Sequence, residues 1–209
     1  MPPKLSRRSR EHLRHRREVL ESALHLFSRK GFDETTMAEI AERAEFAVGT
    51  LYKLFKDKRA IYRALILETM REYEETLTAA LKVPGSESEK LERYIEAKTS
   101  MFVRRIPTAR LYFSQTAGGR FLPTAGLDTE GRVMHQRLMK RVEAVLRSGI
   151  RQGLFVNMDP KMMVLGLEGI SNAFLGELIE RPDDFTAEEM AGLIKKMFFD
   201  PVRTGAINA

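Results

Sequence analysis

The 209-residue chain contains no cysteine, and this absence excludes a disulfide framework and catalysis by a thiol. Long uncharged apolar runs are also lacking. The longest apolar stretches, at residues 162–167 and 170–175, are far shorter than the roughly 20 residues that a membrane-spanning helix needs. The basic N-terminal segment lacks the apolar centre of a signal peptide. We therefore expect a cytoplasmic protein that does not span a membrane.

Candidate catalytic and metal sites are missing from the sequence as well. His12 and His15 are one helical turn apart, but the arginines around them would repel a metal ion and no carboxylate cluster completes a site. The Gly118-Gly119 pair lacks the Lys-Ser or Lys-Thr that follows in a phosphate-binding loop. His135 is either a polar group of a pocket or a solvated surface residue. We predict no enzymatic activity, no metal and no cofactor.

Positive charge is concentrated at the N-terminus. Residues 1–60 hold 14 Lys and Arg against 9 Asp and Glu, which is +5 of the total formal charge of +6. Much of this charge comes from the first 17 residues, which contain Lys4, Arg7, Arg8, Arg10, Arg14, Arg16 and Arg17. Such a segment either contacts DNA phosphates or the minor groove as a flexible arm, or is a solvated tail that aids solubility.

Residues 35–58 read TTMAEIAERAEFAVGTLYKLFKDK and predict two short amphipathic helices joined by a tight turn. The first helix has an apolar stripe of Met37, Ile40, Ala41 and Ala44, and the second has Val48, Leu51 and Phe55. Thr35 or Thr36 caps the first helix, and Glu39 follows Thr36 at the spacing of a capping box. The two stripes pack together, which leaves Gly49, Thr50, Tyr52, Lys53 and Lys56 on the outer face of the second helix.

A helix presented in this way fits the major groove of DNA, where each base pair displays its own pattern of donors, acceptors and methyl groups. Gly49 allows the backbone to approach the duplex closely, and Thr50 can bond to a phosphate or a base edge. Tyr52 offers a hydroxyl group on a rigid ring. Lys58, at the start of the next helix, is placed to reach a phosphate.

The motif GTLYKLFKDK, preceded by the TTMAEIA helix, resembles the DNA-binding domain of the TetR (tetracycline-repressor) family of bacterial transcriptional regulators, and the resemblance runs from about Val19 to about Leu67. It implies an all-helical homodimer in which three N-terminal helices bind an operator and a larger C-terminal domain binds a small inducer. By position, the resemblance makes Thr36, Tyr52 and Lys58 phosphate contacts, and Val48, Gly49, Thr50 and Lys53 contacts to base edges or the groove. This chain departs from the family pattern at Glu45, where Gly is common in the turn, and at Ala47, where Ser is common.

The rest of the sequence also predicts helices, since no alternating strand pattern is present. We expect an all-α protein of about nine helices with a basic arm at 1–17, a helix-turn-helix domain at 18–60 and a ligand-binding and dimerisation domain at 61–209. The predicted helices after the DNA-binding region span about 61–82, 88–104, a segment after Pro107, a long helix capped by Asp128 or Thr129, 160–181 and 187–199. A continuous helix from 61 to 82 would connect the DNA-binding domain rigidly to the C-terminal domain.

The C-terminal domain offers candidates for a pocket and for a dimer interface. The predicted ligand pocket is apolar and aromatic and contains Phe102, Leu111, Tyr112, Phe113, Gln115, Met134, Leu138 and Phe174. The resemblance implies that the last two helices pair across a two-fold axis, with Leu167, Ile170, Ser171, Phe174, Leu178 and Leu193 in the interface. The alternatives are a plain hydrophobic core in place of the pocket and a monomer in place of the dimer.

These observations predict a transcriptional regulator, by the family resemblance a repressor, that binds a palindromic double-stranded DNA operator as a homodimer and is released by a small hydrophobic molecule. Two alternatives remain open. The first is an architectural DNA-binding protein without an inducer, and the second is a helical small-molecule binding protein whose helix-turn-helix is only structural.

Overall fold

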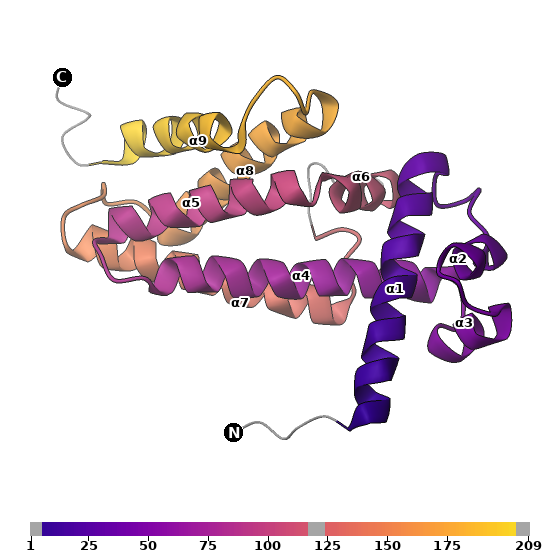
Figure 1. Cartoon of the computed structure of the whole chain (residues 1–209). Coiled ribbons are helices and arrows are strands. Elements are labelled where there is room, and N and C mark those ends of the chain that lie inside the picture. Colours follow the sequence, from indigo (N-terminus) through magenta and orange to yellow (C-terminus); the bar gives the residue numbers. More distant parts are fainter. Residues whose placement is uncertain (1–5, 117–123, 204–209) are drawn as a thin grey trace. The chain divides into compact units, whose positions relative to one another are not determined.

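The structure is a computed structural model that describes residues 6–116 and 124–203. Within these residues it contains nine α-helices and no β-strand (Figure 1). The helices are α1 (Arg7–Lys30), α2 (Met37–Arg43), α3 (Val48–Leu54), α4 (Lys58–Lys82), α5 (Glu87–Arg104), α6 (Ile106–Gln115), α7 (Thr129–Arg151), α8 (Pro160–Glu180) and α9 (Ala187–Val202). The predicted all-α fold is confirmed. The Gly118-Gly119 pair lies outside the described residues.

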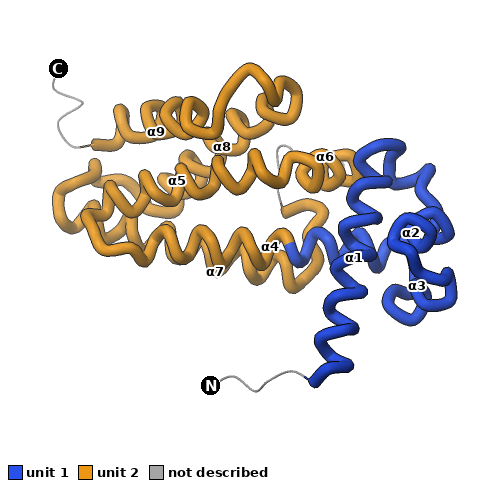
Figure 2. The backbone as a smooth tube through the Cα atoms, in the orientation of Figure 1, with its two compact units in different colours: residues 1–68 blue, residues 69–209 orange. Residues whose placement is uncertain are grey.

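The chain divides into two compact units, residues 1–68 and 69–209, and the boundary falls inside α4 (Figure 2). The boundary predicted from the sequence, between residues 60 and 61, lies within the first turn of α4. Because α4 is one continuous helix, it contributes its first part to the N-terminal unit and the remainder to the C-terminal unit.

The core of the N-terminal unit is formed by one face from each of its helices. α2 packs on both α1 and α3, as the apolar stripes predicted. The buried residues are Val19, Leu20, Ala23, Phe27, Ile40, Ala41, Leu51, Phe55, Ile61 and Leu65. A three-helix arrangement with a shared core holds α2 and α3 at a fixed angle to each other.

The C-terminal unit buries a larger core among α4, α5, α7, α8 and α9. α5 packs on α9, α7 and α8, so it lies centrally in this unit. The later helices of the C-terminal unit begin where the capping signals in the sequence predict. Asp128 caps α7, Asp159 caps α8 ahead of Pro160, and Thr186 forms a capping box with Glu189 at the start of α9.

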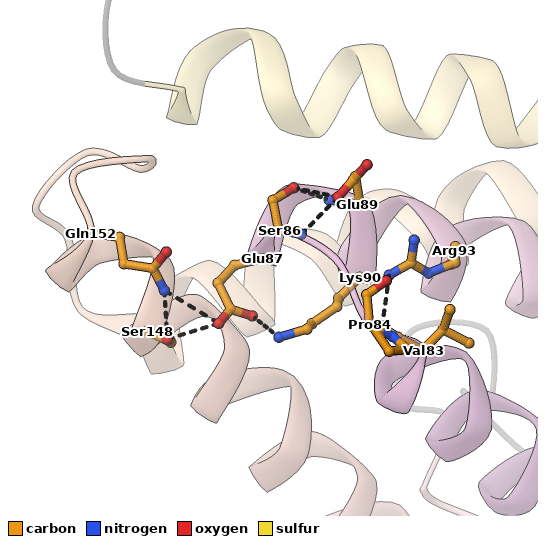
Figure 3. Close-up of polar contacts among 9 residues, drawn as sticks. All are labelled: Val83, Pro84, Ser86, Glu87, Glu89, Lys90, Arg93, Ser148 and Gln152. Atoms are coloured by element: carbon orange, nitrogen blue, oxygen red, sulfur yellow. Dashed lines mark hydrogen bonds and ion pairs between the residues drawn. The ribbon is translucent and has the colours of Figure 1, made fainter.

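A polar cluster joins the start of α5 to the end of α7 (Figure 3). The buried Glu87 carboxylate accepts hydrogen bonds from Lys90 at 2.9 Å, from Ser148 Oγ at 2.9 Å and from Gln152 Nε2 at 3.3 Å. Burial raises the pKa of Glu87, but the hydrogen bonds from Lys90 and Ser148 outweigh it and hold the pKa below its ordinary value. The same view shows Arg93, whose guanidinium group donates to the carbonyl of Val83 after α4. These contacts fix α5 and α7 within the C-terminal unit.

α8 is the one helix in the described ranges that is long and apolar enough to cross a membrane, by length and composition alone. The sequence expectation that no segment qualifies is therefore wrong for residues 160–180. The helix nevertheless packs against α5, α7 and α9 and buries seven residues in the core. It also carries Glu168, which forms an ion pair with Lys98 of α5.

Candidate functional site

The helix-turn-helix in the N-terminal unit begins with a complete capping box. The Thr36 hydroxyl accepts the backbone N–H of Glu39, and the Glu39 carboxylate accepts the backbone N–H of Thr36 at 2.8 Å. A side-chain hydrogen bond from Lys30 and those from Thr36 lower the pKa of Glu39 to about 2. The Thr36 hydroxyl also donates its one proton to Glu39, so its predicted phosphate contact would have to replace this hydrogen bond.

The turn between α2 and α3 contains a strained residue. Glu45 has φ of 60°, and it is the only non-glycine residue in the described ranges with a positive φ. The family pattern commonly has glycine here, because glycine adopts this conformation without a steric penalty. Ala47 then precedes α3 without a side-chain cap, as its methyl group requires. The departures from the family pattern thus leave a positive φ at Glu45 and an uncapped start of α3 at Ala47, and α3 still forms.

α3 presents one face to the core and the opposite face to solvent. Leu51 is fully buried, whereas Val48 is 43% exposed and Tyr52 is 53% exposed. Gly49 and Lys53 are also exposed, and Thr50 is partly exposed. No neighbouring atom lies within 4 Å of the position where a Cβ would stand on Gly49. The predicted groove-facing residues therefore share one accessible helix face.

Lys58 has a role that the sequence did not predict. Its ammonium group donates to the carbonyl oxygens of Phe32 at 2.5 Å and of Asp33 at 2.8 Å, and it lies 4.6 Å from the centre of the Phe32 ring. These contacts attach the start of α4 to the segment after α1. The phosphate contact of Lys58 stays a prediction, for which the ammonium group has one N–H left beyond these two hydrogen bonds.

α1 begins inside the segment 1–17 that the sequence predicts as a basic arm. The expected flexible arm at 1–17 is wrong for residues 7–17, which form the first turns of the helix. Ser6 caps this helix by accepting the backbone N–H of Ser9 at 3.1 Å. Residues 1–5, including Lys4, lie outside the described residues.

The core of the C-terminal unit contains a polar cluster that sequence reasoning missed. Glu168 accepts hydrogen bonds from Tyr94 Oη at 2.8 Å and from Lys98 Nζ at 2.8 Å. The side chain of Lys98 is 3% exposed and that of Glu168 is 12% exposed. Burial raises the pKa of Glu168, but the charge of Lys98 and the two hydrogen bonds lower it below its ordinary value. Tyr73 of α4 bonds to Tyr94 and extends the cluster.

His135 of α7 lies beside this cluster. Burial is the main cause of a lowered pKa for His135, Glu168 raises it, and Lys98 lowers it further. The residue also lines a groove between α7 and α8 of about 280 Å³, together with Met139, Val164 and Lys161 among others. His135 is thus partly buried at the edge of this open groove, and none of the residues predicted to line the ligand pocket belongs to the groove.

The comparisons with known proteins agree with this geometry. A model of bacterial regulatory proteins of the TetR family matches residues 19–65, which include α2, α3 and the start of α4. Residues 19–65 are therefore a DNA-binding domain of the TetR family of bacterial regulatory proteins.

Similarity to known transcriptional regulators extends beyond the DNA-binding region. The HTH-type transcriptional regulator YhgD of Bacillus subtilis is 20% identical over 177 residues, which cover 85% of this chain and 91% of YhgD. The ketosteroid regulator KstR2 of Mycobacterium tuberculosis has a TM-score of 0.71 at 18% identity, over 90% of this chain and 95% of KstR2. The regulator FadR of Bacillus subtilis, solved in complex with stearoyl-CoA, has a TM-score of 0.67 at 18% identity, over 87% of this chain and 96% of FadR. At these identities the two structures show a shared fold.

The residues predicted to line a TetR-type ligand pocket differ in how deeply they are buried. Leu111, Tyr112, Met134 and Leu138 are buried, and Phe102, Phe113 and Phe174 are partly buried. Gln115 is exposed at the end of α6, so the expectation that it points into the interior is wrong. The Tyr112 hydroxyl accepts the backbone N–H of Gly126 at 3.0 Å.

Three of the side chains predicted for the TetR-type dimer interface face the core of the chain. Leu167, Ser171 and Leu178 are fully buried within one chain, so their side chains are not available to a partner. Ile170 and Phe174 are partly buried, and Leu193 is 39% exposed. Besides Leu193, the exposed large apolar side chains of α8 and α9 are Met162, Leu165 and Met197, none of which was predicted for the interface. Gly166, Gly169 and Ala173 are exposed on α8 as well.

Among the described residues there is no group of three or more His, Asp or Glu side chains that could hold a metal ion.

Proposed function

We propose that the chain is a ligand-responsive repressor that binds a palindromic operator as a homodimer in the cytoplasm and is released by a small hydrophobic molecule. The observation that carries this proposal is the outer face of α3, where Val48, Gly49, Tyr52 and Lys53 are exposed on a helix whose inner face is fixed in the core. An isolated helix of seven residues would not hold this geometry without that core.

The residues on α3 divide into two groups by chemistry. Val48, Gly49, Thr50 and Lys53 are placed to contact base edges, because a short apolar or hydrogen-bonding side chain there can distinguish thymine methyl groups and donor–acceptor patterns. Tyr52 offers its hydroxyl group to a phosphate, as Thr36 and the remaining N–H of Lys58 can. Phosphate contacts position the protein, and base contacts give it sequence preference.

The apolar surface of α8 and α9 supports a homodimer. Leu165 is 66% exposed, and Met162 and Met197 are each 54% exposed. Exposed apolar side chains on adjacent helices favour burial against a partner. The exposed glycines of α8 would allow a second helix to approach closely. A two-fold dimer with two copies of α3 reads two related half-sites, and this is why the operator is expected to be palindromic.

The effector site is proposed inside the C-terminal unit, near the Tyr94, Lys98 and Glu168 cluster. A buried ion pair is rarely more stabilising than apolar packing of the same volume, so its presence in a core suggests a further role. The Ser171 hydroxyl lies one helical turn after Glu168, is fully buried, and has no hydrogen-bond partner among the described residues. These groups would bind the polar end of an otherwise apolar ligand. FadR was solved with stearoyl-CoA, so a long-chain acyl-CoA belongs in the first panel of test compounds.

Selection of bound fragments from a random DNA pool tests the proposal, repeated with and without a panel of hydrophobic molecules. A palindrome with ligand-sensitive release supports the repressor. A palindrome that no compound affects favours the architectural protein, and no sequence preference at low salt favours the binding protein without a DNA role.

A further inference from the structure

The first turns of α1 form a helix that has no core of its own. Residues 6–14 are all exposed, and even Leu13, which continues the apolar stripe of the helix, is 48% exposed. Figure 2 shows these turns extending past the rest of the N-terminal unit. Short helices without tertiary packing are marginal in water, so the packing of α1 onto the unit does not explain why the helix continues this far.

Arginines occupy one side of this exposed part. Arg7, Arg10, Arg14 and Arg17 follow the spacing of a single helix face, within an arc of about 80° at 3.6 residues per turn. The packing face of α1, marked by the buried Val19 and Ala23, lies on the other side of the helix. Residues 7–14 contain four arginines and one glutamate, a formal charge of +3. The arginine face is therefore directed to solvent as a continuous positive strip.

Two contacts fix this strip beside the helix-turn-helix. The His15 ring packs against Phe46, in the turn before α3, with ring centres 4.9 Å apart. The Arg16 guanidinium group lies 4.4 Å from the centre of the Phe55 ring, which ends α3. The direction of α1 at residues 15 and 16 is thus set by the residues on either side of α3.

We propose that the arginine face of residues 7–17 contacts the phosphate backbone of the DNA bound by α3. This inference rests on the proposed function. The chemistry is that of guanidinium groups on phosphate, which adds affinity at every sequence and no base preference. Eight residues of helix span about 12 Å, which is comparable to about three or four phosphates along one strand.

The test measures binding of the full chain to a fluorescently labelled random-sequence duplex over a range of KCl concentrations. We compare wild type with Arg7→Gln/Arg10→Gln/Arg14→Gln. The matched control is Glu11→Gln/Glu18→Gln, because these substitutions break the Arg7–Glu11 and Arg14–Glu18 pairs of the same helix and keep every arginine. Circular dichroism shows whether each variant retains its helix.

Each lost phosphate contact lowers the slope of log affinity against log salt by about 0.9, so the triple variant is expected to lose up to about 2.7 per protomer. Its affinity falls on the order of tenfold or more at moderate salt, while its order of preference among selected sequences is unchanged. The glutamate control binds as tightly as wild type or more tightly. An unchanged slope in the triple variant overturns the inference and leaves the proposed function standing. A wild type without salt-dependent DNA binding overturns both.

Discussion

Replacing Lys98 by methionine would remove the cation from the most deeply buried ion pair among the described residues. The side chains of Lys98 and Glu168 are 3% and 12% exposed, so water cannot solvate the carboxylate that remains. Loss of one partner of a buried pair costs about 3–5 kcal/mol, against a total stability of about 5–15 kcal/mol for a typical domain. We therefore expect Lys98→Met to lose a large part of the stability of the C-terminal unit at pH 7.

The same variant should respond to pH in the opposite direction from wild type. In wild type the folded pKa of Glu168 is lowered from 4.5, so its contribution is present above pH 4.5 and is lost as the pH falls through the folded pKa. Without Lys98, burial dominates and raises the folded pKa above the unfolded value. The variant then regains stability as the pH falls and Glu168 becomes protonated. The difference in unfolding free energy between wild type and Lys98→Met should therefore become smaller as the pH falls.

Urea denaturation followed by far-UV circular dichroism measures these differences, since the chain has no tryptophan for fluorescence. The double variant Lys98→Met/Glu168→Gln removes both charges and keeps an acceptor for Tyr94. It should recover about 2–3 kcal/mol relative to the sum of the single changes. A single variant that costs less than about 1 kcal/mol, or a gap that widens in acid, would refute the reasoning about this pair.

Three further predictions concern other parts of the chain. Glu45→Gly should stabilise the N-terminal unit by about 0.5–1 kcal/mol in thermal unfolding, because it relieves a positive φ, whereas Glu42→Gly inside α2 should cost about 1 kcal/mol; equal effects would contradict this. His135→Gln should reduce the loss of unfolding free energy that wild type shows in urea titrations as the pH falls below 6.5. The reason is that the pKa of His135 is lowered in the folded chain, so the unfolded chain takes up the proton first. A pH profile identical to that of wild type would exclude this contribution of His135. Lys58→Met should destabilise the N-terminal unit by about 1–2 kcal/mol, because the hydrogen bonds to the Phe32 and Asp33 carbonyls are lost. The control is Arg59→Gln, which changes an exposed side chain and should leave the unfolding free energy unchanged. Similar losses in both variants would contradict the role assigned to Lys58.

The helix order was predictable because helix ends are local signals. Asp159 before Pro160 and Thr186 before Glu189 name the starts of α8 and α9 without reference to the rest of the fold. The capping box at Thr36 and the unusual turn at Glu45 were visible in the same way. Each depends on a few neighbouring residues.

The errors came from features that depend on packing. α8 is apolar on nearly every side, so the sequence did not distinguish the face with Leu167 and Ser171, which is buried, from the face with Leu165, which is exposed. Lys58 and Phe32 are far apart in sequence, and no local pattern predicts their contact. The first turns of α1 were missed because their polar residues carry no apolar period.

The central claim is that the exposed face of α3 reads DNA sequence. The most direct measurement is a selection from a random DNA pool with wild type, Val48→Ala and Tyr52→Phe, followed by affinities for each recovered site. We expect a palindrome for wild type, a changed preference for Val48→Ala, and uniformly weaker binding with unchanged preference for Tyr52→Phe. Recovery of the same sequences at the same affinity by all three proteins would contradict it.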